Sequence, residues 1–200
     1  KRIADLDAPI LIFGETGTGK EMLAKACHQS SRRADKAFLA LNCGALPDNV
    51  AETELFGYAA GTFNQTEGKA GLLELAAGGT LLLDEIADMS VHLQAKLLRV
   101  LEDGEFRRVG DVNPVAVDVR FICTTCQDLG QLVDEGKFRK ELYYRLNVLG
   151  LVVPALRERR SDIVPLSESF ILQHSAKLGR RPAKLSKSCV EFLQQYPWPG

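Results

Sequence analysis

The chain has 200 residues, of which 46% are hydrophobic and 26% charged, and its formal net charge is −1 at pH 7. This composition supports a buried core and excludes an intrinsically disordered chain. The near-zero charge argues against a domain whose own surface clamps nucleic acid, because such surfaces are strongly basic. No apolar run approaches the roughly 20 residues that cross a bilayer, and the N-terminus does not read as a signal peptide. We therefore expect a cytoplasmic protein with no membrane partner.

Five cysteines are scattered along the chain. An odd number without regular spacing does not indicate a disulfide framework and suits a reducing compartment. Cys123 and Cys126 form a C-x-x-C, but no second pair completes a metal site. Both lie in or directly after an apolar run, so a packing role is the favoured interpretation.

Short apolar runs alternate with segments of helical periodicity over most of the chain. The runs "APILIFG", "AFLALNC", "GTLLLDE", "VDVRFICTT" and "VLGLVVP" predict five strands. A helix is predicted from Lys20 to about Ser30, with Met22, Leu23 and Ala26 on its apolar face. A further helix is predicted where leucines recur at helical spacing, at Leu93, Leu97, Leu98 and Leu101. This alternation predicts an α/β fold with a parallel sheet covered on both faces.

The pattern changes to two helices from about Ser161. "SDIVPLSESFILQHSAKLG" opens with the cap residues Ser161 and Asp162 and predicts a helix that ends near Gly179. "KLSKSCVEFLQQY" predicts a second helix before "PWPG". We expect an α/β core over residues 1–156 and a partial small helical subdomain over residues 157–200.

The stretch "GETGTGKE" follows the first predicted strand and opens the first predicted helix. Glycines let the backbone wrap around phosphate, so that N–H groups and the positive helix end face the anion. Lys20 would supply a point charge to the β- and γ-phosphates. Glu21 stands where this pattern usually has Ser or Thr facing Mg²⁺. The predicted nucleotide contacts are Gly14, Glu15, Thr16, Gly17, Thr18, Gly19, Lys20 and Glu21.

The strand "GGTLLLDE" ends in two carboxylates, Asp84 and Glu85. On its own, an acidic pair at a strand end is commonly a solvated turn. Downstream of a P-loop lysine, with one strand between, it indicates that Asp84 holds Mg²⁺ and Glu85 polarises an attacking water. The two stretches together predict ATP and Mg²⁺ as cofactors and hydrolysis by an in-line water.

Five segments carry a family resemblance: "GETGTGKE", "LNCGALPDNVAETELFG", "GGTLLLDEIADMSVHLQAKLLRVLEDGEFRRVG", "FRKELYYRLNV" and "PALRERRSDI". They resemble the AAA+ domain of bacterial enhancer-binding transcription activators, ATPases that act on sigma-54 RNA polymerase. The resemblance covers essentially the whole chain. It implies a three-layer AAA+ P-loop domain with a parallel sheet, followed by the start of a small helical lid. Glu21 is usual in that family.

The resemblance also implies roles for single residues. Asn42 matches the switch asparagine that holds the catalytic glutamate, here Glu85, until the γ-phosphate is sensed. Arg139 and Arg145 match the arginines that reach into the neighbouring subunit's site, which makes hydrolysis depend on assembly. The alternative for both arginines is a role as surface helix charges.

The two sensor positions of the family are incomplete in this chain. "TTCQ" lies at the first sensor, with Thr125 as a nucleotide contact and Cys126 where the family usually has Asn, so weaker γ-phosphate sensing is expected. A second sensor arginine normally follows "WPGN", which lies beyond Gly200. We therefore expect lid-side sensing to be absent from residues 157–200.

The segment Gly61–Thr66 replaces the family's sigma-54-contacting hexapeptide G-A-F-T-G-A. Asn64 stands for the contacting threonine and Gln65 for the second glycine. With "LDAP", "LALNC", "ACHQ" and "LQAKLLR", this departure is most similar to the TyrR/PhhR branch, regulators of aromatic amino acid genes. We expect Gly61–Thr66 to be exposed and mobile and not to bind sigma-54.

That branch implies a repressor or activator in which ATP and an aromatic amino acid such as tyrosine promote self-association, from a dimer to a hexamer-type ring. Housekeeping RNA polymerase, and DNA through a helix-turn-helix, would be contacted by regions outside this chain. ATP hydrolysis would be weak or regulatory. The alternative is a mechanochemical ATPase that remodels sigma-54 polymerase. A metabolic P-loop kinase is disfavoured, because no second-substrate motif occurs and the paired arginines indicate a ring.

Overall fold

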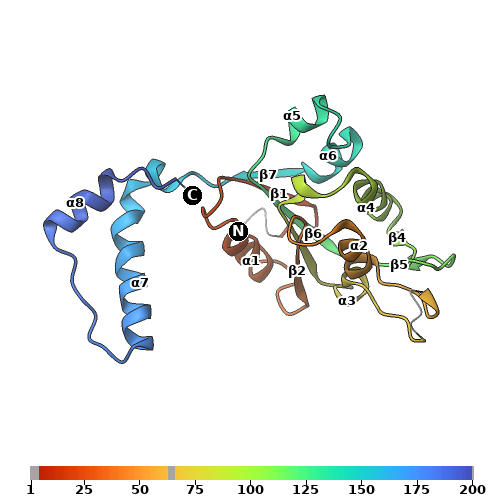
Figure 1. Ribbon diagram of the computed structural model, residues 1–200, viewed down its shortest axis with the longest axis horizontal. Helices are drawn as coiled ribbons and strands as arrows, with labels where there is room; N and C mark the ends of the chain where they lie inside the picture. Colours follow the sequence, from red (N-terminus) through yellow and green to blue (C-terminus); the bar gives the residue numbers. More distant parts are fainter. Residues whose placement is uncertain (1–4, 63–65, 200) are drawn as a thin grey trace. The chain divides into compact units, whose positions relative to one another are not determined.

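The computed structural model describes residues 5–62 and 66–199. The chain divides into two compact units, Lys1–Gly14 with Gly19–Val152 and Glu15–Thr18 with Val153–Gly200 (Figure 1). Among the described residues, no helix is both long and apolar enough to cross a membrane.

The first unit is built on a five-stranded sheet in which every neighbouring pair is parallel. The strand order is β2-β3-β6-β1-β7, and the five strands are those predicted from the apolar runs. Their bounds are Ile10–Phe13 (β1), Phe38–Asn42 (β2), Thr80–Asp84 (β3), Arg120–Thr125 (β6) and Leu149–Val152 (β7). A separate antiparallel pair joins β4 (Glu105–Phe106) to β5 (Val115–Ala116). The predicted α/β fold with a parallel sheet is confirmed.

Helices connect these strands and continue in the second unit. In the first unit they are α1 (Lys20–Gln29), α2 (Asp48–Phe56), α3 (Leu72–Leu75), the 3₁₀ turn η2 (Ile86–Asp88), α4 (Val91–Asp103), α5 (Leu129–Asp134) and α6 (Lys140–Leu146). In the second unit they are η3 (Leu156–Glu158), η4 (Arg160–Asp162), α7 (Ile163–Lys177) and α8 (Lys187–Gln195).

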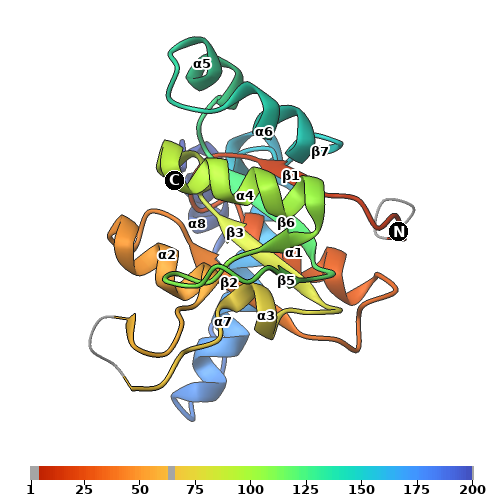
Figure 2. The same ribbon diagram turned by 90° about the vertical axis from the view of Figure 1, so that its right-hand side faces the viewer.

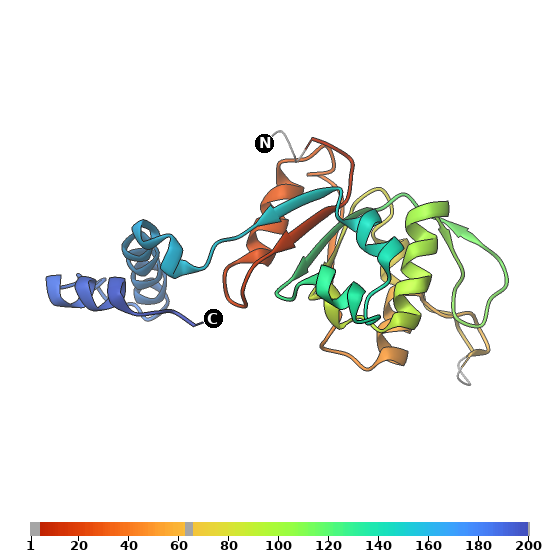
Figure 3. The same cartoon turned by 90° about the horizontal axis from the view of Figure 1, so that it is seen from above.

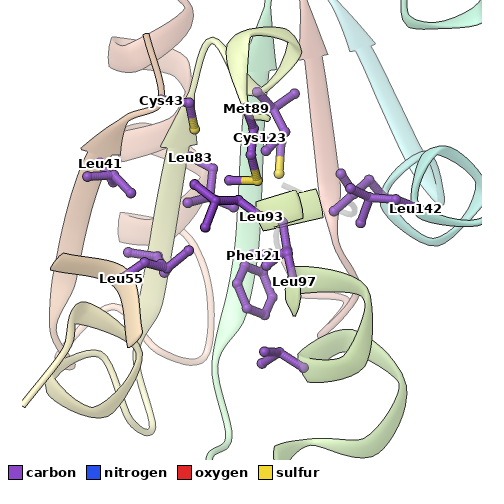
Figure 4. Close-up of a cluster of buried hydrophobic side chains, with 14 of the residues drawn as sticks. Leu41, Cys43, Leu55, Leu83, Met89, Leu93, Leu97, Phe121, Cys123 and Leu142 are labelled. Carbon is purple, nitrogen blue, oxygen red and sulfur yellow. The ribbon is translucent and has the colours of Figure 1, made fainter. Parts of the chain in front are cut away.

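Strand residues alternate between two faces of the sheet, and each face is covered. On one face, the buried residues Leu83, Phe121 and Cys123 pack against Leu97 of α4 and Leu142 of α6 (Figure 4). The opposite face carries the alternate buried residues of the same strands and is covered by α1, which contacts β1, β3 and β6. Seen from above, α1 and α4 lie on opposite sides of the sheet (Figure 3).

The predicted apolar face of α1 is wrong. Met22 is 79% exposed, and Ala26 is also exposed. The buried positions are instead Lys20, Ala24 and His28, which recur every four residues. The small Ala24 lets the helix lie close to the sheet, and the buried stem of Lys20 fixes which face points inward.

His28 is a buried polar residue at the end of α1, 4% exposed. Its Nδ1 lies 3.0 Å from the hydroxyl oxygen of Thr80, and its ring centre lies 5.1 Å from that of Phe38. Burial, with a smaller contribution from nearby Arg120, lowers the pKa of His28 below the ordinary 6.5. The folded protein therefore keeps this imidazole neutral.

Acidification is expected to destabilise the fold through His28. Above pH 6.5 the ring is neutral in both states. As the pH falls below this value, the unfolded chain binds the proton more readily, so the free energy of unfolding falls. Urea unfolding between pH 7.5 and 5.5 should show a smaller decrease for His28→Gln than for wild type. Equal decreases in the two proteins would contradict this account of His28.

The segment between α2 and α3 has an ordered base. Tyr58 and Lys69 exchange two backbone hydrogen bonds of 3.0 and 2.9 Å, and Lys69 Nζ contacts Glu54 at 2.5 Å. Backbone passes so close here that a Cβ on Gly71 would lie 2.5 Å from the Leu55 carbonyl oxygen. Gly57 has a φ of 71°, which favours glycine. The glycines of this segment therefore serve a tight crossing of two chain segments.

The same base is joined to the segment that follows β4. The Val109 N–H donates to the Gly57 carbonyl, and the Ala59 N–H donates to the Val109 carbonyl, both at 3.0 Å. Figure 2 shows the two segments side by side next to β5. Gly61 and Thr66 are exposed as predicted, whereas Thr62 is half-buried. The predicted mobility of Gly61–Thr66 centres on residues 63–65, which lie outside the described residues.

In the second unit, the two predicted helices are present as α7 and α8, which contact each other. Ser186 caps α8 by accepting the Cys189 N–H at 3.2 Å. Asp162 occupies the predicted cap position of α7, but its side chain makes no capping hydrogen bond. This helix therefore begins from η4 and not from a side-chain cap.

Candidate nucleotide-binding and hydrolysis site

The loop between β1 and α1 has the backbone shape of a phosphate cradle. Gly17 and Gly19 have φ values of 80° and 95°, which only glycine adopts at little cost. The loop closes through the Thr18 N–H and hydroxyl, which both donate to the Glu15 carbonyl at 3.3 and 2.7 Å. Because Gly19 supplies no side-chain cap, the first N–H groups of α1 are available to an anion.

Lys20, the first residue of α1, is 6% exposed. Its Nζ donates to the Gly14 carbonyl at 3.0 Å and forms an ion pair with Glu85 Oε1 at 3.0 Å. A buried ammonium is held here between the phosphate-cradling loop and the end of β3. The structure thus brings together two residues that the sequence predicted for one site.

Asp84, the last residue of β3, is fixed through both carboxylate oxygens. The Asn42 side-chain amide donates to Asp84 Oδ2 at 3.1 Å, and the Thr124 hydroxyl donates to Oδ1. The parallel register explains the first contact, because Asn42 and Asp84 are direct partners in the β2–β3 ladder. The carboxylate is therefore oriented by the two strands on either side of it.

Glu85 follows the strand in a conformation that is unusual for a residue with a side chain. Its φ of 51° and ψ of 56° lie in the left-handed region, and such strain concentrates at functional sites. The Glu85 N–H donates to Thr124 Oγ1 at 3.1 Å, and Oε2 accepts the Cys126 N–H at 2.9 Å. Burial raises the pKa of Glu85, but hydrogen bonds from Lys20 and Cys126 outweigh it and lower the pKa overall. Glu85 is therefore a carboxylate at neutral pH.

The role expected for Asn42 needs a correction. The family resemblance implies that Asn42 holds Glu85, whereas its amide contacts Asp84. Its Oδ1 accepts the Gly44 N–H at 3.0 Å. Strand register causes this, because Glu85 lies one residue beyond the ladder and turns toward Lys20.

The two threonines at the end of β6 have different partners. The Thr125 hydroxyl, a predicted nucleotide contact, accepts the Gln127 N–H at 3.0 Å within a local turn. Thr124, which the sequence reasoning missed, contacts both Asp84 and Glu85. The available signal was the tandem Thr-Thr at a strand end, since period-two alternation points only one of them toward β3.

Replacing Thr124 by Val should lower ATP turnover about tenfold, because a hydrogen bond to a charged group is lost at almost unchanged volume. Nucleotide affinity should change less than turnover, since Thr124 acts through Asp84 and Glu85. Steady-state kinetics and nucleotide titration measure the two quantities. Thr53→Val, on a half-buried hydroxyl of α2, is the matched control. Equal turnover in all three proteins would contradict this positioning role.

Arg139 and Arg145 lie at the start and near the end of α6, and both are exposed. The Arg139 N–H donates at 2.8 Å to Gln94 Oε1, whose fully buried side chain also donates to the Met89 and Lys137 carbonyls. Within residues 5–62 and 66–199, no salt bridge joins either arginine to Lys20, Asp84 or Glu85. The two guanidinium groups are thus presented outward from a firmly anchored helix.

The second unit contributes two arginines that the sequence reasoning did not assign. Arg157 pairs with Glu15 through both guanidinium nitrogens, and Arg159 donates to the Thr18 carbonyl at 2.7 Å. Both come from "PALRERRSDI", so the motif was noticed but its residues were not separated. The remaining predicted contacts Thr16, Gly17 and Glu21 are exposed.

The donor set fits a nucleoside triphosphate with Mg²⁺. Mg²⁺ is usually held by one or two carboxylates together with substrate phosphates, and Asp84 is one oriented carboxylate. Within the part of the chain that is described, no group of three or more His, Cys, Asp or Glu residues could hold a metal. The C-x-x-C forms no such site, because Cys123 is buried in β6 and Cys126 is exposed beyond it.

Comparison with known proteins agrees with this geometry. The chain is 54% identical over its whole length to the HTH-type transcriptional regulatory protein TyrR of Enterobacter agglomerans and spans 39% of that protein. It is 46% identical over its whole length to the putative uric acid sigma-54-dependent transcriptional regulator UacR of Escherichia coli, of which it spans 34%. The crystal structure of NtrX from Brucella abortus in complex with ATP matches all of this chain and 43% of that one, with 42% identity and a TM-score of 0.92.

Family comparisons assign both parts of the chain. Residues 157–200 match the AAA+ ATPase lid domain. Residues 1–152, which include the phosphate-cradling loop, Asp84, Glu85 and both exposed arginines, match the Sigma-54 interaction domain. The chain therefore belongs to the Sigma-54 interaction domain family of AAA+ proteins.

Proposed function

We propose that the chain binds ATP with Mg²⁺ at the loop between β1 and α1 and at the end of β3. The observation that carries this proposal is the buried Lys20 Nζ, held 3.0 Å from Glu85 beside the glycine loop. Lys20 and the loop N–H groups would bind the phosphates, and Asp84 would hold Mg²⁺. The ATP complex of NtrX, at 42% identity, supports the assignment.

Hydrolysis would use Glu85 to orient and polarise a water in line with the γ-phosphate. Bound Mg²⁺ would neutralise charge on the β- and γ-phosphates. Lys20 exchanges its Glu85 partner for phosphate oxygens when ATP binds, so Glu85 then becomes available to water. Asn42 and Thr124 keep Asp84 in place throughout, and Thr124 also fixes the turn at Glu85.

Arg139 and Arg145 would complete the site of a neighbouring subunit in an assembled ring. Their exposure on α6 and the anchoring of Arg139 by Gln94 support this role. An arginine that acts in trans stabilises charge on the transferring phosphoryl group, so turnover would rise with assembly.

The biological role we propose is the central domain of a TyrR-like regulator of aromatic amino acid genes. ATP and an aromatic amino acid such as tyrosine would promote self-association, and regions outside this chain would contact DNA and housekeeping polymerase. The 54% identity to TyrR and the altered hexapeptide at Gly61–Thr66 support this choice.

Remodelling of sigma-54 polymerase is the second candidate, and the family's description and the similarity to UacR favour it. A pull-down with sigma-54 in the presence of a transition-state nucleotide analogue separates the two. We expect no retention of sigma-54. Robust retention that disappears in Phe63→Ala, but not in the nearby control Lys69→Ala, would replace the regulatory proposal by the remodelling one.

A further inference from the structure

A cavity of about 630 Å³ lies within the first unit, away from Lys20 and Glu85. The C-terminal half of α4 and the segment from Glu105 to Pro114 form most of its wall. This volume falls in the range of small-molecule sites, and the wall combines apolar surface with a few charged groups.

Part of the charge in this wall is already paired. Arg108 contacts both carboxylate oxygens of Glu74, at 2.8 and 2.5 Å, and Lys96 forms an ion pair with Glu52. Asp111 accepts the N–H and the side-chain amide of Asn113, each at 3.0 Å. These groups shape the cavity.

Four other wall residues are not committed in this way. Arg99, Asp103, Glu105 and Arg107 are exposed, and none makes a salt bridge with another described residue. Arg99 and Asp103 are four residues apart on α4, so they share one helix face. The cavity therefore offers two cations and two carboxylates to one ligand.

The apolar part of the wall is aromatic at its base. The rings of Phe56 and Phe106 are tilted, with centres 5.9 Å apart, and Lys96 Nζ lies 5.7 Å from the Phe56 ring centre. Val109 and Pro114 extend this surface toward the opening. An apolar side chain of a ligand would find a matching surface here.

We propose that this cavity binds a free aromatic α-amino acid. Its carboxylate would contact Arg99 and Arg107, its ammonium group would contact Asp103 and Glu105, and its ring would lie toward Phe106. A simple anion would leave the two carboxylates uncompensated, whereas a zwitterion satisfies both signs. The proposal rests on the aromatic effector of the proposed function and assigns it a place.

Val109 gives this cavity a route to the loop segment. It lines the cavity and exchanges backbone hydrogen bonds with the base of Gly57–Gly71. A ligand that holds the Glu105–Pro114 segment would therefore also hold that base. Occupancy should slow amide exchange in both segments.

Calorimetry with L-tyrosine, in the presence of ATP and Mg²⁺, tests the site. Arg107→Ala and Asp103→Asn should each weaken tyrosine binding at least about tenfold, since each removes a charge-assisted contact. Arg181→Ala, on an exposed arginine of the second unit, should leave it unchanged. Tyramine and 3-(4-hydroxyphenyl)propionate, which lack one charge each, should bind more weakly than tyrosine to wild type.

ATP titration of the same proteins separates the two proposals. All three variants should bind ATP like wild type, with circular dichroism unchanged. Tyrosine binding that is unchanged within twofold in both cavity variants would overturn the location of the site. Wild type that binds ATP but no tyrosine would overturn the ligand class while the nucleotide site stands. Hydrogen exchange should show tyrosine-dependent protection of residues 105–116, and its absence in a protein that binds tyrosine would also overturn the location.

Discussion

Replacing Lys20 by Ala is expected to weaken ATP binding at least about 100-fold while the fold remains intact. The Lys20 ammonium is buried and positioned at the glycine loop, so its loss removes a charge-assisted contact to phosphate that water cannot replace there. Calorimetric titration with ATP and Mg²⁺ measures the loss. Circular dichroism and thermal unfolding verify the fold.

Lys25→Ala is the matched control, because Lys25 lies on the same helix and is exposed. It removes the same charge and should bind ATP like wild type. Lys20→Ala that binds ATP as tightly as Lys25→Ala would show that the nucleotide site lies elsewhere.

A mixture of Arg139→Ala with Glu85→Gln is expected to hydrolyse ATP faster than the sum of the separate proteins. Each variant alone should lose turnover about 100-fold or more, the first by losing charge stabilisation and the second by losing the base. In a mixed assembly, some shared sites combine an intact Arg139 from one subunit with an intact Glu85 from the next. Phosphate release at fixed total protein measures the gain.

The control replaces Arg139→Ala by Lys140→Ala, a neighbouring exposed cation. That protein should be active by itself, and its activity should not depend on the partner variant. No gain in the Arg139→Ala mixture, with co-assembly confirmed by sedimentation, would count against action in trans.

The sheet was predictable because its strands are buried on both faces and read as continuous apolar runs. The face of α1 was not, because its inward residues are Lys20, Ala24 and His28, which no hydrophobic pattern selects. A buried lysine stem and a buried histidine bonded to Thr80 behave here as core residues. The helix was therefore placed correctly and rotated wrongly.

The members of the site were predictable from motifs, but their partners were not. Asn42 contacts Asp84 because strand register sets the two side by side, and register is a property of the assembled sheet. The choice of Thr124 over Thr125 depends likewise on which face of β6 points toward β3. Sequence patterns identify such residues more readily than they pair them.

Contacts between segments distant in sequence were outside the reach of pattern reasoning. Val109 pairs with the base of the Gly57–Gly71 segment, and buried Gln94 anchors Arg139. Neither link has a local signature, because both depend on chain segments brought together by the fold. The cavity beside α4 arises for the same reason.

Sedimentation velocity of the chain without ligand, with a slowly hydrolysed ATP analogue and Mg²⁺, and with the analogue plus tyrosine tests the central claim most directly. The proposed function predicts a shift to larger species with nucleotide, a further shift with tyrosine, and neither shift in Lys20→Ala. An identical distribution in all three conditions, at nucleotide and tyrosine concentrations that saturate binding, would contradict it.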